Sequence, residues 1–283
     1  MFPEDDDPAD FRKMGSMMIK LFVGCSANGE DAEAQLLLEY TLRKHATDEV
    51  ELTWMKLSRN PESPWYSDPK KNAGWNTVGW ATPFSPFRWA IPHVCNFEGR
   101  AIYTDVDMIF MADINELWTQ TIPEGKCLLA KNEQQTCVML FDNARCKSFF
   151  PNFDSLRRNQ GLYRNVRKNI GANAAKFSGN WNCLDGESYK SLSDPEIKLI
   201  HFTKVETQPH QKWAIPRLRK SNQKHWGEHA RQCGLPHARQ DVAPLVDKLW
   251  ADAHAAGYSV EKYLDQNEFY GQYHHVRAGP RAA

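Results

Sequence analysis

The chain has 283 residues, which is enough for one large α/β domain or two small ones. Hydrophobic residues make up 41% and charged residues 25%, as is typical of a soluble globular protein with a sizeable core. Lysine plus arginine equals aspartate plus glutamate at 35 each, so the bulk charge argues against a nucleic-acid-binding protein.

The first sixteen residues carry a run of acids and no apolar periodicity, and we expect residues 1–16 to form a disordered acidic leader. No apolar run approaches the roughly 18–20 residues of a membrane span, and the beginning of the chain lacks the order of a secretory signal. The seven cysteines include no Cys-x-x-Cys pair and several lie in apolar runs, which indicates reduced thiols. We therefore expect a cytoplasmic protein.

The next segments alternate strand, helix and strand. Residues 18–23 form an apolar run that Gly24 ends, which predicts a buried strand. Residues 31–45 predict a helix that Asp31 can cap, and residues 50–57 predict a second strand. This order predicts a parallel sheet with a nucleotide-sized crevice at the carboxyl ends of its strands.

The rest of the chain continues this pattern with longer loops. Residues 58–86 are rich in Pro, Asn, Gly and Trp and predict a long ordered loop. Pro244 at a first helical position predicts an amphipathic helix that Gly257 ends. Further strands are predicted at 100–104, 127–131, 136–141 and 197–202, helical segments at 87–94, 113–118 and 144–163, and a loop-rich region at 170–195.

The strongest local signal is a buried strand that ends in two carboxylates, Asp105 and Asp107. Residues two apart on a strand share a face, and in the turn directly after a strand both can address one cation. Two neighbouring carboxylates repel each other, and a divalent metal removes that repulsion. Hard oxygen ligands suit Mg²⁺ or Mn²⁺, and the alternative is a turn whose aspartates accept backbone hydrogen bonds.

A second polar group follows the last predicted strand, which ends in His201. A neutral imidazole is a good third ligand for Mn²⁺ or a similar ion, and Lys212 a little further on could contact a β-phosphate. From His201 to Arg239 there are eight lysines or arginines against two glutamates, which suits a phosphate-bearing ligand. A strand-end histidine and a basic stretch also occur for structural reasons alone.

Several segments carry a family resemblance in their order along the chain: Phe84–Trp89, Tyr103–Ile109, Asp113–Trp118, Thr136–Asp142, Trp181–Gly186, and His201-Phe202 with Lys212-Trp213. Together they resemble the GT-A glycosyltransferases, especially the family 8-like group, over about residues 18–215. The resemblance implies an α/β fold with a mixed, mostly parallel sheet flanked by helices. It implies metal-assisted transfer of a hexose-type sugar from a nucleotide-diphosphate sugar, with UDP-sugar favoured, to a hydroxyl acceptor with retention.

The resemblance also implies roles for individual residues. Asp105 and Asp107 would hold Mn²⁺ or Mg²⁺ with His201 as the third ligand. Asn182 and Asp185 would act at the donor sugar, and an inverting route would instead use Asp185 or Asp142 as a base. The residues implied in donor binding are Gly24, Cys25, Ser26, Arg88, Asp105, Val106 and Lys212.

This chain departs from the family pattern at two places. It lacks the glycine ahead of the terminal lysine, so Lys204 or His210 could replace Lys212. The sugar-facing loop lacks the usual acid-Gln-Asp run, which leaves the roles of Asn182 and Asp185 open.

We assign residues 17–220 to a catalytic domain and 221–283 to a helical extension packed on it. The expected partners are a nucleotide-sugar donor and a glycan, glycolipid or other hydroxyl acceptor, with no nucleic acid. The C-terminal region could touch the inner face of a membrane. Three alternatives remain: a non-catalytic nucleotide-sugar-binding homologue, a D-x-D phosphatase and a sugar nucleotidyltransferase. The last two fit less well, because the motif lies far from the start and no Gly-rich signature follows the first strand.

Overall fold

The computed structural model describes residues 18–77, 80, 82–158, 168–229 and 232–264. The predicted leader, the tail from residue 265 and the end of the helix predicted at 144–163 lie outside these ranges. One six-stranded sheet forms the centre, in the order β2 (Val50–Met55), β1 (Ile19–Gly24), β5 (Arg100–Asp105), β8 (Val138–Asp142), β7 (Leu128–Ala130) and β9 (Ala174–Lys176).

Parallel pairing dominates this sheet. Strand β1 runs parallel to β2 and β5, and β7 runs parallel to β9, whereas β8 is antiparallel to both β5 and β7. The apolar runs of β1 and β5 are buried, as expected for central parallel strands covered on both faces. The predicted mixed, mostly parallel α/β sheet is therefore confirmed.

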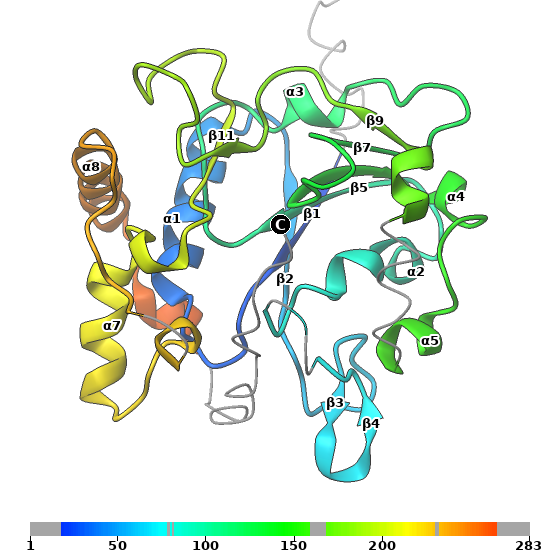
Figure 1. Cartoon of the computed structure of the whole chain (residues 1–283), viewed down its shortest axis with the longest axis horizontal. Coiled ribbons are helices and arrows are strands. Elements are labelled where there is room, and N and C mark those ends of the chain that lie inside the picture. Colours follow the sequence, from blue (N-terminus) through cyan, green and yellow to red (C-terminus); the bar gives the residue numbers. More distant parts are fainter. Residues whose placement is uncertain (1–17, 78–79, 81, 159–167, 230–231, 265–283) are drawn as a thin grey trace, which may run out of the picture.

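Helices flank the sheet. In Figure 1, α1 (Ala32–His45), α7 (Gln211–Lys220) and α8 (Val242–Ala255) lie at one side of the view, and α2 (Ile91–Val94), α4 (Asn143–Cys146) and α5 (Phe153–Arg158) lie at the other. Among the described residues, no helix is both long and apolar enough to cross a membrane. The shorter elements are α3 (Asn115–Trp118), β3 (Ser67–Asp68), β4 (Ala73–Gly74) and the 3₁₀ turns η2 (Pro69–Lys71), η3 (Phe87–Trp89), η4 (Val205–Thr207), η5 (Trp226–His229) and η6 (Val260–Tyr263).

A second, three-stranded sheet begins where β5 ends. Its order is β10 (Cys183–Leu184), β11 (Leu199–His201) and β6 (Met108–Phe110), with β11 parallel to β10 and antiparallel to β6. The register places His201 opposite Met108. The chain therefore passes from one sheet to the other through the short segment that carries the two aspartates.

The described part of the C-terminal region packs on α1. Val246 and Leu249 of α8 share an apolar cluster with Leu37 of α1. Near the end of the described chain, the Tyr263 hydroxyl donates to the Glu39 carboxylate at 3.0 Å. This packing is compatible with the extension that the sequence predicts, and the boundary at residue 220 stays a prediction.

Some local predictions need correction. Helix α8 begins at Val242, so Pro244 is its third residue; the first-turn amides have no intrahelical acceptor, and proline is tolerated there. Asp31 stands at the N-cap of α1, but its side chain makes no capping hydrogen bond. The predicted loop 58–86 contains the β3–β4 hairpin, and the predicted loop 170–195 contains β9 and β10. Gly257 follows α8 with a φ of 85°, as the predicted helix end requires.

Candidate active site and metal centre

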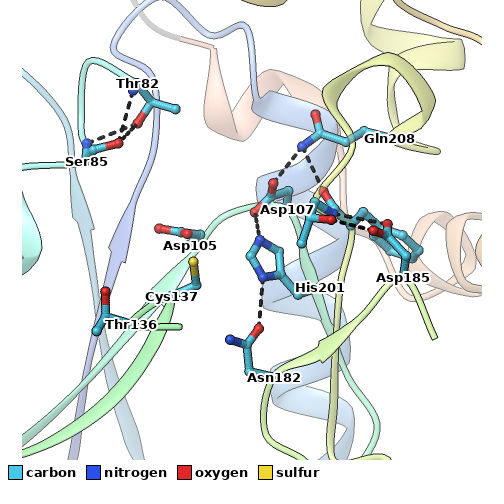
Figure 2. A network of polar contacts seen from close by, with 12 residues as sticks. Thr82, Ser85, Asp105, Asp107, Thr136, Cys137, Asn182, Asp185, His201 and Gln208 are labelled. Atoms are coloured by element: carbon cyan, nitrogen blue, oxygen red, sulfur yellow. Dashed lines mark hydrogen bonds and ion pairs between the residues drawn. The ribbon is translucent and has the colours of Figure 1, made fainter. Parts of the chain in front are cut away.

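Asp107 and His201 meet because of the way the two sheets join, and a ligand atom of Asp105 lies within 4.8 Å of one of His201. Asp105 is the last residue of β5, Asp107 directly precedes β6, and His201 ends β11. The antiparallel β6–β11 pairing brings the last of these beside Asp107, and the Phe202 amide donates to the Asp107 carbonyl at 3.0 Å. Figure 2 shows the Asp107 carboxylate and the His201 ring pointing toward each other.

The contact between Asp107 and His201 joins two hydrogen-bond acceptors when the imidazole is neutral with its proton on Nδ1. The Asp107 Oδ1 atom lies 3.4 Å from His201 Nε2, and the other ring nitrogen, Nδ1, lies 2.9 Å from the Asn182 side-chain oxygen. When Nδ1 donates to that oxygen, Nε2 presents a lone pair to Asp107. Asp107 Oδ1 is buried without a hydrogen-bond partner in the described part of the chain. Either a proton or a cation has to lie between these two atoms.

The pKa values of this pair reflect their burial and their charges. Burial raises the pKa of the Asp107 carboxyl, and the neighbouring His201 only partly offsets that effect. Burial by itself would lower the pKa of the His201 imidazolium, but the charge and hydrogen bond of Asp107 together with the charges of Asp105 and Asp185 outweigh it, and the net pKa is raised. A divalent cation at this point would displace the proton and keep both side chains in their ligand forms.

Asp105 is held by a different set of partners. The Arg88 guanidinium donates to its Oδ1 atom at 2.8 Å and to the Thr136 carbonyl at 2.9 Å. The Tyr103 hydroxyl donates to the same carboxylate oxygen. Arg88 is only 8% exposed; burial alone would lower its pKa, but the charge of Asp105 raises the net value. Arg88 therefore braces the first carboxylate of the motif, whereas the sequence analysis implied it in donor binding.

Three residues that the resemblance implies in donor binding, Gly24, Cys25 and Ser26, lie at the carboxyl end of β1, beside the end of β5. The parallel register pairs Gly24 with Asp105. A β-carbon at Gly24 would lie 3.0 Å from the Phe84 ring and from the Tyr103 hydroxyl, so a larger residue here would require those side chains to shift. Cys25 and Ser26 follow and are buried, as is Val106 between the two aspartates.

Gln208 is a site residue that the sequence analysis did not identify. Its amide nitrogen donates to Asp107 Oδ2 at 2.6 Å and to the Phe202 carbonyl at 3.0 Å. The sequence analysis points instead to Lys212, four residues further on. No local pattern distinguishes a glutamine that binds a carboxylate from one that faces solvent.

Cys137 is a second residue that the sequence did not point to. It lies just before β8, and its carbonyl accepts from the Asp105 amide at 3.2 Å. Its sulfur lies with ligand atoms of Asp105 and His201 in a group whose members are all within 4.8 Å of one another. Burial raises the pKa of the Cys137 thiol. The centre thus combines carboxylate, imidazole and thiol groups, and the orphaned Asp107 oxygen beside them fits a divalent cation.

Asn182 and Asp185 flank β10, the strand that pairs with β11, and therefore lie next to His201. Asn182 is fully buried and orients the His201 ring, while the Lys131 ammonium donates to the Asn182 carbonyl at 2.7 Å. Asp185 accepts from the Thr203 amide at 3.1 Å and from the Thr203 hydroxyl, and it lies 3.4 Å from His237 Nε2. The structure therefore brings both residues close to His201, as Figure 2 shows.

Two predicted site residues are not brought to this cluster. Asp142 caps α4 and pairs in register with Arg100, at the opposite end of β5 from Asp105. Lys212 lies in α7, and its ammonium contacts Asp247 of α8 and the ring of Trp213.

The sheet order, the crossing between the sheets and the strand-end centre define a GT-A-type α/β fold.

No family model and no curated protein matches this sequence. Among solved structures, the bifunctional glycosyltransferase WbbM matches with a TM-score of 0.51 at 12% sequence identity. The match covers 70% of this chain and 47% of the WbbM chain, so this chain spans less than half of WbbM. An active-site mutant of LgtC matches with a TM-score of 0.50 at 10% sequence identity, and the match covers 83% of this chain and 96% of the LgtC chain. GlyE of Streptococcus pneumoniae matches with a TM-score of 0.50 at 13% sequence identity, and the match covers 85% of this chain and 63% of the GlyE chain.

Proposed function

We propose that the chain is a metal-dependent glycosyltransferase that moves a hexose-type sugar from a nucleotide-diphosphate sugar to a hydroxyl group. The observation that carries the proposal is the buried, 3.4 Å contact between the Asp107 and His201 ligand atoms, at the end of a central strand. The GT-A-type fold supports it, because the solved structures that share it are glycosyltransferases. The galactosyltransferase LgtC is described in complex with donor and acceptor sugar analogues.

Asp105, Asp107 and His201 would hold Mn²⁺ or Mg²⁺ in this proposal. The bound cation would supply Lewis-acid stabilisation of the departing nucleoside diphosphate. The chain's own residues prepare the site for it. Arg88 holds the Asp105 carboxylate in place by a hydrogen bond, and Asn182 aims the lone pair of His201.

The donor would lie along the carboxyl edge of the sheet, with the nucleoside near Gly24, Cys25 and Ser26. Asn182 and Asp185 would face the donor sugar, because both lie beside His201. Lys212 enters this proposal only through the resemblance, since its ammonium contacts Asp247 in this structure. Retention at the anomeric carbon also rests on the resemblance, as does the preference for a UDP-sugar.

The test is release of nucleoside diphosphate from a panel of nucleotide sugars, assayed with Mn²⁺, with Mg²⁺ and after chelation. We expect release with at least one donor, loss of release on chelation and recovery when metal is restored. Asp107→Asn should lower kcat/KM by at least about 100-fold, because electrostatic stabilisation of the leaving group is a large part of such catalysis. The matched control is Asp154→Asn, whose carboxylate is 72% exposed and lies on α5.

Two outcomes would contradict the proposal. Donor binding without release, with any acceptor class, would favour the non-catalytic homologue. Release of inorganic phosphate from a phosphomonoester would favour the phosphatase. If transfer is observed, NMR of the new anomeric proton decides between retention and inversion, and an inverted product would direct attention to Asp185 as the base.

The acceptor and the compartment stay proposals. All seven cysteines are free thiols, which supports a reducing compartment such as the cytoplasm. A glycan, a glycolipid or another hydroxyl compound would serve as acceptor, and a glycolipid would bring the enzyme to a membrane surface.

A further inference from the structure

Three buried ligand-type side chains meet outside the centre described above. Asp31 stands where α1 begins, His210 stands where α7 begins, and His225 lies just before η5. Each offers one ligand atom, and these atoms all lie within 4.8 Å of one another. The three residues are 3%, 3% and 0% exposed. Polar groups buried this deeply need partners, so the cluster calls for an explanation.

Asp31 turns its carboxylate away from the helix that it begins. An aspartate at an N-cap ordinarily accepts from the amides of the first turn, but Asp31 makes no such bond. Its Oδ2 atom accepts from the Ser26 amide at 2.8 Å, and its Oδ1 atom lies 3.5 Å from His225 Nε2. One oxygen is therefore fixed by the backbone while the other faces the histidines.

A second buried acid lies beside this carboxylate. Glu30 is 2% exposed and accepts from the Ser26 hydroxyl at 2.9 Å. In the described part of the chain neither Glu30 nor Asp31 pairs with a lysine or arginine. The nearby Arg217 guanidinium is instead committed to Glu33 at 2.6 Å. The charge that faces these two acids is that of His225: burial alone would lower its pKa, but hydrogen bonds to Asp31 and Cys233 and the charges of Asp31 and Glu30 raise it to about 10.

His210 supplies the observation that points to a ligand. Its Nε2 atom is buried and has no hydrogen-bond partner in the described part of the chain. A neutral imidazole in such a place loses its bonds to water and gains none in return. Coordination of a metal through this lone pair would remove the deficit.

His225 carries a ring proton that metal binding would move. Its Nδ1 atom accepts from the Gly227 amide at 3.1 Å, which leaves the proton on Nε2. The Cys233 sulfur hydrogen-bonds the same ring. With a metal on Nε2 the ring proton would pass to Nδ1, and the Gly227 amide would then lose its acceptor there.

We propose that Asp31, His210 and His225 form a site for a zinc-type divalent transition-metal ion. Two imidazoles and one carboxylate are ligands that Zn²⁺ favours, and water or the adjacent Glu30 can complete four-coordination. The ion would tie the loop after β1 to the segment that carries Gln208, two residues before His210. Gln208 donates to Asp107, so a metal here would hold part of the D-x-D centre in place. This proposal does not depend on the chemistry of glycosyl transfer.

The experiment measures zinc in the full-length chain carrying Asp107→Asn and His201→Ala, which disables the first centre. We expect about one zinc per chain after gel filtration, loss of that zinc with a strong chelator, and a fall in Tm that added zinc reverses. Adding His210→Ala should lower zinc affinity by more than about 100-fold, because loss of an outer partner alone already costs 10- to 100-fold. His254→Ala, an exposed histidine of α8, is the matched control.

Cobalt substitution gives a second readout that does not need the His210 variant to fold. In the same double variant we expect visible d–d bands without a sulfur-to-cobalt charge-transfer band, because the proposed ligands are two imidazoles and a carboxylate. A sulfur band would mean that Cys137 or Cys233 binds the ion and would overturn the proposal. Absence of bound zinc together with a Tm that does not respond to zinc would also overturn it, whatever the outcome of the transferase assays.

Discussion

Gln208 holds Asp107 by one oxygen and leaves the other to face His201. The Gln208 amide nitrogen donates to Asp107 Oδ2 at 2.6 Å, whereas Oδ1 lies 3.4 Å from His201 Nε2. The same nitrogen donates to the carbonyl of Phe202, the residue after His201. The glutamine therefore fixes the second carboxylate of the motif relative to the histidine.

Gln208→Ala should weaken metal activation and leave the fold intact. A hydrogen bond to a charged group contributes about 1.5–3 kcal/mol, so we expect the Mn²⁺ concentration for half-maximal activity to rise roughly 10- to 100-fold. Gln208→Glu should be worse, because it places a second negative charge against Asp107. A titration of activity with Mn²⁺ measures both, with Gln223→Ala as the control on the same segment. An unchanged titration for Gln208→Ala would remove the positioning role.

Asn182 should act through His201. Asn182→Ala removes the acceptor for the Nδ1 proton, and loss of such an outer partner typically costs 10- to 100-fold in metal affinity. Asn182→Asp keeps an acceptor oxygen and should retain much more of that affinity than alanine does. Calorimetry with Mn²⁺ compares the two variants. Equal losses in both would mean that the asparagine contacts the donor and does not orient the ring.

Arg88 should contribute more to the unfolding free energy than an exposed arginine does. Arg88→Met leaves the buried Asp105 carboxylate without its cation, and breaking a buried pair typically costs about 3–5 kcal/mol of unfolding free energy. The exposed Arg219, which pairs with Glu228, is the control, and Arg219→Met should cost less than about 1 kcal/mol. Urea denaturation measures both. A small effect at Arg88 would mean that Asp105 is hydrated or protonated once the arginine is gone.

The Lys212–Asp247 pair should be weak. Both side chains are about half exposed, at 44% and 51%, and exposed pairs contribute about 0–1 kcal/mol. A double-mutant cycle with Lys212→Ala and Asp247→Ala should give a coupling energy in that range that falls as salt is added. A specific loss of donor affinity in Lys212→Ala, with Asp247→Ala unaffected, would instead support the phosphate role that the resemblance implies.

The sequence predicted the elements whose periodicity is local. The apolar run at residues 18–23, the helix at 31–45 and the strand at 100–104 all occur, because their burial patterns repeat within a few residues. Strand β6 is only three residues long and was not predicted. Its pairing with β11 is a long-range event, so the residues alone could not show that Asp107 faces His201 at hydrogen-bond range.

The same limit explains the residues that were missed. Cys137 reaches Asp105 because β8 runs antiparallel to β5, and a strand's direction is not encoded in its own residues. Helix α7 was not predicted, since Pro216 lies inside it and its apolar side is short. Without that helix, Gln208 and His210 could not be placed at its start, and Lys212 could not be placed against α8.

The two aspartates belong to different sheets, since Asp105 ends a strand of the six-stranded sheet and Asp107 leads into the three-stranded one. A metal ion coordinated by both aspartates would link the two sheets at the point where they join. Metal binding should then slow amide hydrogen exchange along β6 and β11, beginning with the Phe202 amide that donates to the Asp107 carbonyl.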